Sequence, residues 1–162
     1  MTPLFKKLNL KEHTQIVVID APVEFEAELS ALGELSAVDV LRSAAGVSRV
    51  EFALVFVRTQ DAIDKHAREI VAKVPGDPIL WFAYPKASSK RYSCDFNRDS
   101  GWDTLGELGF EGVRQVAIDD DWSALRFRRV EHIKSLTREK NHAITADGKR
   151  RASSPSEQGD NQ

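Results

Sequence analysis

Three short apolar runs stand out in the hydrophobic pattern of the chain, at residues 15–20, 52–57 and 79–84. Each run is nearly continuous and is rich in β-branched or aromatic side chains. Runs of this length and composition are typical of strands that are buried on both faces. The pattern therefore predicts the central strands of a covered, parallel sheet.

Apolar residues at helical spacing occupy the segments between these runs. Phe25, Leu29 and Leu32 recur at i, i+4 and i+7, which predicts one face of an amphipathic helix. Pro22 suits its N-terminus and Gly33 its C-terminal stop.

Two further helices follow from similar signals. Thr2 and Pro3 resemble a helix start, and Thr59 can cap a helix whose first turn carries Asp61. The apolar stripe of this second helix consists of Ile63, Ala67, Ile70, Val71 and Val74.

The pattern changes after residue 90. A short helix carrying Trp102, Leu105 and Leu108 is expected to be capped by Asp99 or Ser100 and to stop at Gly109. Strands are predicted at residues 113–118 and 124–130. In the latter, Leu125 and Phe127 alternate with Arg126 and Arg128, which indicates one wet face and an antiparallel hairpin at the sheet edge.

Strands that alternate with helices predict an α/β fold, a Rossmann-like three-layer sandwich with a mostly parallel sheet. The terminal hairpin matches the order of elements in Rossmann-like methyltransferases. A weaker strand at residues 37–42 would form the other edge. Residues 1–134 are expected to form one domain, and residues 135–162 to be a disordered polar tail because they contain almost no apolar side chains.

Composition limits the function without defining it. The net charge of −2 gives no basic excess for nucleic acid, and no run is long enough to cross a membrane. The single cysteine, Cys94, excludes an internal disulfide framework. No secretory leader is recognisable at the N-terminus, so a cytoplasmic location is expected.

Four stretches resemble a family of small bacterial proteins that is known only as a domain of unknown function with a Rossmann-like fold. They are LFKKLNLKEHTQIVVIDAP, ALVFVRTQ, ILWFAYPKASSK and DDDWSALRFRRV, and the resemblance spans residues 4–131. The most specific pieces are residues 56–58, 84–90 and 119–127. The resemblance implies the fold, in the form of a degenerate methyltransferase, and no activity.

The common nucleotide-cofactor motifs are missing. The turn after the first strand contains Asp20, Ala21 and Pro22 but no glycine, so the backbone cannot approach a cofactor in the usual way. Pro22 also removes a backbone donor. No cofactor is therefore predicted, although an unusual binding mode stays open.

The best candidate site lies where the strands end, because ligands of open α/β sheets bind beyond the carboxyl ends of strands. Asp20, Arg58 and Lys86 follow three predicted strands, and would converge if those strands are neighbours. Together with the other candidate ligand-binding residues, Ser88, Ser89 and Lys90, they could grip an anionic group. The alternative is that Asp20 caps the first helix and pairs with Arg58, while 86–90 is a solvated loop.

Other chemistry is poorly supported. Ser88 and Ser89 lack a nucleophile-elbow motif, and no metal site is predicted because the histidines are scattered. The arginines of the last strand are expected to be mostly solvated charge, with nucleic acid an improbable partner.

Two hypotheses follow. The first is a non-enzymatic module that binds a small anionic ligand or a protein partner through the crevice. The alternative is a divergent methyltransferase-like or nucleotide-using enzyme, which rests on strand order alone. The two differ in whether the crevice is open or is filled by Phe25, Tyr84 and Trp102. A homodimer through the hairpin edge is a further possibility, and the oligomeric state is left open.

Overall fold

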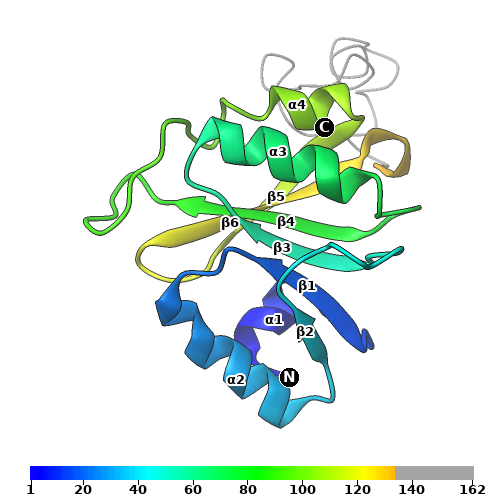
Figure 1. The fold of residues 1–162 in the computed structure, drawn as a ribbon. Coiled ribbons are helices and arrows are strands. Elements are labelled where there is room, and N and C mark those ends of the chain that lie inside the picture. The colour runs from blue at the N-terminus through cyan, green and yellow to red at the C-terminus, as the bar shows by residue number, and fades with distance from the viewer. Residues whose placement is uncertain (134–162) are drawn as a thin grey trace.

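The computed structural model describes residues 1–133, which form a Rossmann-like α/β sandwich (Figure 1). A six-stranded sheet has the order β2-β1-β3-β4-β6-β5. Its parallel part contains β1 (Gln15–Ile19), β2 (Asp39–Leu41), β3 (Phe52–Phe56) and β4 (Ile79–Pro85). The hairpin of β5 (Phe110–Ala117) and β6 (Trp122–Arg129) completes it in the antiparallel sense. The predicted fold class is confirmed.

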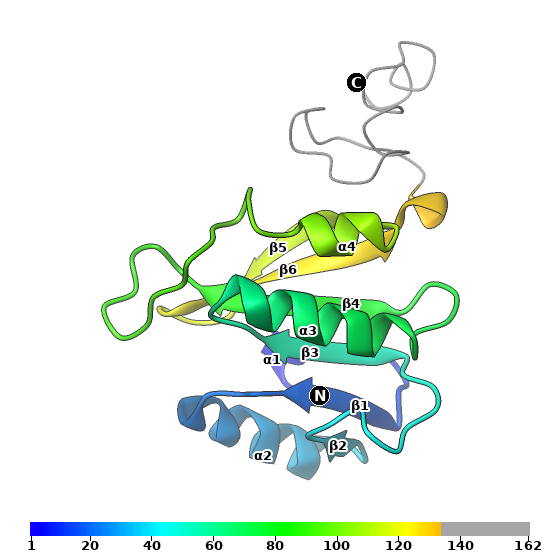
Figure 2. The same ribbon diagram turned by 45° about the horizontal axis from the view of Figure 1, so that its top comes forward.

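Helices cover both faces of the sheet (Figures 1 and 2). One face carries α1 (Pro3–Lys7), the short 3-10 helix η1 (Val23–Phe25) and α2 (Glu26–Leu35). The other face carries α3 (Gln60–Val71) and α4 (Asp103–Glu107). A last 3-10 turn, η2 (Val130–His132), follows β6. The predicted tail at 135–162 lies outside the described residues.

The two faces have separate cores because alternate strand residues point in opposite directions. In β3, Ala53 and Val55 pack toward α3, whereas Phe52, Leu54 and Phe56 pack toward α1 and α2. All five residues of β3 are buried. A continuous apolar run is therefore the sequence signature of a strand between two helical layers.

Most predicted helix signals are confirmed. Thr2 caps α1 and Thr59 caps α3, each by accepting a hydrogen bond from a backbone N–H one turn ahead. Gly33 does not stop α2, which continues to Leu35 and ends at Ser36. A glycine stop needs a left-handed backbone, and Gly33 is not among the glycines with positive φ.

The start of α4 also differs from the prediction. Neither Asp99 nor Ser100 caps it, and Trp102 is the N-cap residue without a side-chain capping bond. Trp102 is 2% exposed and is fixed by the core, so packing rather than a cap sets the beginning of this helix.

The hairpin is antiparallel, as predicted, and β5 forms the sheet edge while β6 pairs with β4. The face of β6 that was predicted to be exposed to solvent is only partly exposed, because Arg126 and Arg128 are half-buried and Arg128 forms an ion pair with Asp77. None of the helices in residues 1–133 is long and apolar enough to cross a membrane.

Candidate functional site

The carboxyl ends of β1, β3 and β4 meet at one edge of the sheet because these strands are parallel neighbours. Asp20, Arg58 and Lys86 directly follow these strands or come within two residues of them, so they share that edge, as the sequence predicts. Each of the three nevertheless has different neighbours. Their surroundings divide the edge into two regions.

Asp20 belongs to the first region, at the end of β1. Its backbone is left-handed, with φ of 57°, and its Oδ2 lies 3.0 Å from Nε2 of the buried His66 on α3. The contact ties the end of β1 to α3. An Asp20–Arg58 pair is not among the ion pairs of residues 1–133, and Asp20 makes no helix-capping hydrogen bond to η1 or α2.

Arg58 lies over the ring of Tyr92, with its guanidinium carbon 5.3 Å from the ring centroid. The Tyr92 hydroxyl donates to Glu24 Oε1 at 2.5 Å, and Arg91 lies 3.8 Å from the other oxygen of Glu24. This hydrogen bond from Tyr92 holds the pKa of Glu24 below its usual value. Tyr92 thus links the Arg58 guanidinium, which lies over its ring, to the Glu24 carboxylate, which accepts its hydroxyl proton.

Residues 86–98, here called the crossing loop, connect this region to the hairpin. The Ser89 hydroxyl donates to Asp121 Oδ1 at 2.8 Å and accepts from the backbone N–H groups of Arg91 and Tyr92. Asp95 accepts a hydrogen bond from the backbone N–H of Gln60 at the start of α3. The loop is therefore fixed to the hairpin, to η1 and to α3, and the Ser89 hydroxyl is committed to its structure.

The second region is a cavity of about 440 Å³ at the end of β4, here called the β4 cavity. This volume falls in the range of about 300–1,000 Å³ that is typical of small-molecule sites. The end of β4, the crossing loop and the hairpin all contribute to its wall. The lining residues are Tyr84, Pro85, Lys86, Ala87, Ser89, Tyr92, Ser93, Cys94, Phe96, Asn97, Arg98, Gln115 and Ser123.

The charged side chains of this lining are all positive. Lys86 and Arg98 are the two ionic side chains in it, and none of the lining residues is acidic. Two carboxylates contact the lining from outside it and are engaged by its hydroxyl groups: Asp121 accepts from Ser89, and Glu24 accepts from Tyr92. The lining therefore favours an anionic guest.

Tyr84 adds a directed donor. It is 4% exposed, and its hydroxyl oxygen accepts a hydrogen bond from Nε2 of Gln115 at 3.0 Å. Since that lone pair is occupied, the phenolic proton is free to point at a ligand acceptor. Burial raises the pKa of Tyr84, which keeps the hydroxyl protonated at neutral pH.

Trp102 positions the far wall of the β4 cavity. Its indole Nε1 donates to the backbone carbonyls of Asn97 and Arg98, at 2.9 and 3.1 Å. The centroid of its ring lies 5.1 Å from the ring centroid of Phe96 and 5.8 Å from that of Tyr84. Of the two alternatives, an open crevice or one filled by Phe25, Tyr84 and Trp102, the structure has an open cavity: Tyr84 lines it, Trp102 packs behind the lining, and Phe25 lies in the core on the other face of the sheet.

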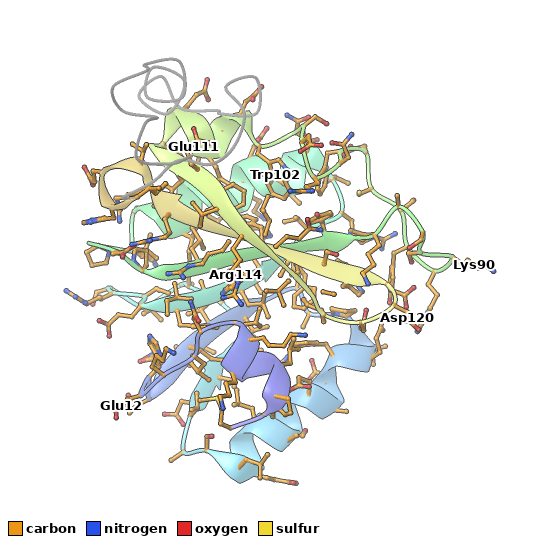
Figure 3. All side chains as sticks on the ribbon, turned by 180° about the vertical axis from the view of Figure 1, so that it is seen from behind. Glu12, Lys90, Trp102, Glu111, Arg114 and Asp120 are labelled. Atoms are coloured by element: carbon orange, nitrogen blue, oxygen red, sulfur yellow. The ribbon has the colours of Figure 1, made fainter. Side chains whose placement is uncertain are left out.

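Six residues were predicted to bind a ligand, and the structure places them in different surroundings. Lys86 and Ser89 line the β4 cavity, and Arg58 lines a neighbouring hollow that shares Ser93 and Cys94 with it. Asp20, Ser88 and Lys90 are exposed and line neither space, and Lys90 lies at the tip of the loop (Figure 3). The ligand-binding role of all six stays a prediction.

Sequence reasoning missed Arg98 and Gln115. Arg98 lies in a polar loop without a motif, and Gln115 reaches the cavity only because β5 returns beside β6. Within residues 1–133, no three histidine, cysteine, aspartate or glutamate side chains gather closely enough to hold a metal ion.

Comparison with known proteins identifies no family for this chain. No family model matches the chain, so the resemblance to a domain of unknown function stays a prediction. No curated protein matches it either. One solved structure, described as a protein in the NADB-Rossmann superfamily from Streptococcus agalactiae, is 11% identical, with a TM-score of 0.42. The match covers 96% of this chain and 76% of that one, and similarity this low carries no argument about this chain.

Proposed function

We propose that the protein is a binding module for a small anionic ligand, which occupies the β4 cavity. The observation that carries the proposal is the composition of the lining, with Lys86 and Arg98 as the ionic groups and no carboxylate among the lining residues. A carboxylate or phosphate group would meet both cations and the hydroxyl proton of Tyr84. The apolar rings of the lining would contact the rest of the ligand.

The position at β4 also accounts for the missing cofactor motif. At the end of β1, Asp20 contacts His66, and at the end of β3, Arg58 lies against Tyr92. Asp20 and Arg58 thus each have a side-chain partner within the chain, whereas the Lys86 and Arg98 side chains form neither an ion pair nor a cation–π contact within residues 1–133. The proposal therefore places binding beside the hairpin, and assigns no catalytic residue.

The test uses the full chain and four probes: inorganic phosphate, phenyl phosphate, AMP and, as the neutral counterpart of AMP, adenosine. Binding is followed by thermal shift and by protection of Cys94, the single cysteine, which lines the cavity. A probe at a hundred times its Kd stabilises the folded state by about 2.7 kcal/mol. We expect at least one anionic probe to raise the melting temperature and slow the modification of Cys94, and adenosine to do neither.

Variants locate the site. Lys86→Gln and Arg98→Gln should each weaken binding of the anionic probe about tenfold, the loss of one charge-assisted hydrogen bond. Lys65→Gln and Arg68→Gln, on the exposed surface of α3, make the same charge changes elsewhere and should leave binding intact. Arg58→Gln tests whether the probe binds in the neighbouring hollow, which Arg58 lines, instead of in the β4 cavity. Equal binding of adenosine and AMP, an effect of Arg58→Gln alone, or no protection by any anionic probe would each overturn the proposal.

A further inference from the structure

A buried hydroxyl group without a partner lies in the wall of the β4 cavity. Ser123 on β6 is directly opposite Tyr84 on β4, and it lines the cavity although the residue is only 4% exposed. Its neighbours along the strand, Trp122 and Ala124, belong to the core under α1 and α2. Because alternate strand residues point in opposite directions, the Ser123 side chain points to the other face of the sheet, which it shares with Tyr84.

The Ser123 hydroxyl makes no hydrogen bond within residues 1–133. Other small polar groups of the lining differ in this respect. The Ser89 hydroxyl is bonded to Asp121 and to two backbone N–H groups, and the Cys94 thiol donates to the Phe96 carbonyl at 3.0 Å. Buried polar groups in folded proteins almost always have a partner, and an unsatisfied one costs stability. A partner for Ser123 is therefore expected in the cavity that it faces.

Gln115 adds a second group of the same kind. It lies opposite Leu125 of the core under α3, so its side chain is on the same face as Tyr84 and Ser123. Its Nε2 donates to the Tyr84 hydroxyl at 3.0 Å, and Oε1 of the same amide has no partner among the described residues. An amide oxygen can only accept hydrogen bonds. Hydrogen-bonding groups thus extend across β4, β6 and β5 on the cavity side of the sheet.

These groups require more of a ligand than negative charge. A fully ionised phosphate or carboxylate group offers only acceptors, which suit Lys86 and Arg98 but give Oε1 of Gln115 no donor. An ammonium group would supply a donor, but the two cations of the lining repel it. A neutral hydroxyl group both donates and accepts, so it can satisfy Gln115 and Ser123 alike.

On the basis of the proposed function, we infer that the ligand of the β4 cavity is an anionic polyol. Its hydroxyl groups bond to Ser123 and Gln115, and its phosphate or carboxylate group bonds to the cations. The rings of Tyr84, Tyr92 and Phe96 contact its carbon atoms. A site that hydrogen-bonds a ligand hydroxyl discriminates against the analogue that lacks it. The cavity should therefore select hydroxylated anions over alkyl anions of the same size.

Matched pairs of probes test this selectivity on the full chain by isothermal titration calorimetry. Ribitol 5-phosphate is compared with pentyl phosphate, and gluconate with hexanoate, so that the members of a pair share the anionic group and the carbon chain. We expect the polyol member of at least one pair to bind at least about tenfold more tightly than the alkyl member. The pair that binds shows whether the anionic group is a phosphate or a carboxylate. Ribitol, which has no charge, should bind far more weakly than its phosphate.

Ser123→Ala locates the hydroxyl contact. We expect it to weaken the polyol probe by about fivefold or more and to leave its alkyl counterpart unchanged, so that the selectivity of the cavity falls. Ser48→Ala, which removes an exposed hydroxyl between β2 and β3, is the matched control and should change neither affinity. Without ligand, Ser123→Ala should melt no lower than the wild type, because the removed hydroxyl has no partner within residues 1–133.

The outcomes separate this inference from the proposed function. Equal affinity within both pairs, tighter binding of the alkyl members, or unchanged selectivity in Ser123→Ala would overturn the anionic polyol and leave the anion site standing. A melting temperature of Ser123→Ala several degrees below the wild type would also overturn it, by showing that the hydroxyl is held within the fold. No binding of any anionic probe would overturn the proposed function, and the polyol with it.

Discussion

The two regions at the carboxyl edge of the sheet differ in how their charges are balanced. At the ends of β1 and β3, the polar groups are engaged within the chain: Asp20 by His66, and Glu24 by Tyr92. In the β4 cavity, Lys86 and Arg98 face a space without a carboxylate in its lining. In this Rossmann-like sheet, side chains of the chain itself thus occupy the region beyond β1 and β3, and the region beyond β4 stays available to a ligand.

The crossing loop connects the two regions and makes the comparison testable. Tyr92 and Asp95 attach it to the first region, whereas Ser89 and the carbonyls held by Trp102 shape the second. Changes in either region should therefore lower stability, and only changes in the second region should also alter the binding of a probe in the β4 cavity.

The largest effect is expected from Trp102→Ala. Trp102 is 2% exposed and contacts the rings of Phe82, Tyr84, Phe96 and Phe127. Its removal should lower the free energy of unfolding by about 3–5 kcal/mol, measured by urea denaturation. Trp102→Phe should lose less stability but should still weaken anionic probes, because the Arg98 carbonyl loses its donor. Unchanged probe affinity in Trp102→Phe would show that the cavity wall does not depend on this tryptophan.

A smaller effect is expected from Ser89→Ala, which removes a donor to Asp121 and an acceptor for two backbone N–H groups. The expected cost is about 1–2 kcal/mol by thermal or urea denaturation. Ser88→Ala is the matched control, because Ser88 is exposed and should change stability by less than about 0.5 kcal/mol. Equal effects of the two variants would contradict the role of Ser89 in holding the crossing loop.

Asp20→Ala should destabilise the protein by about 1 kcal/mol, because alanine tolerates the left-handed backbone at this position poorly. Asp20→Gly separates two explanations. If the backbone dominates, glycine is close to the wild type, and if the contact with His66 dominates, glycine is at least as destabilising as alanine. Probe binding in the β4 cavity should be unchanged in both, and a loss would mean that the two regions are one site.

The smallest effect is a pH dependence. The pKa of Glu24 is lowered from its ordinary 4.5 by the hydrogen bond from Tyr92, so the folded state binds its proton less readily than the unfolded chain. The stability from this pair is present above pH 4.5 and is lost as the pH falls through the lowered pKa. Tyr92→Phe should reduce the loss of stability between neutral and acid pH, compared in parallel urea titrations. The same acid slope in both proteins would mean that other carboxylates, such as Asp77, account for it.

The elements and their arrangement in layers could be predicted from the sequence. Buried runs such as 52–57 fit between two helical layers and not at a surface, because both faces of the strand are apolar. Thr2 and Thr59 marked helix starts for a local reason, the capping of nearby N–H groups. The start of α4 was missed because the packing of Trp102, not a cap, sets it, and the end of α2 was missed because Gly33 does not adopt the left-handed backbone of a helix stop.

The candidate site, by contrast, depends on tertiary structure. Lys86 could be found from the sequence because it directly follows a strand, and the ends of parallel neighbours meet. Arg98 and Gln115 could not, since their meeting with Tyr84 depends on the path of a long loop and on β6 lying between β4 and β5. Local sequence encodes which residues follow a strand, whereas the balance of charge in a cavity depends on residues that only folding brings together.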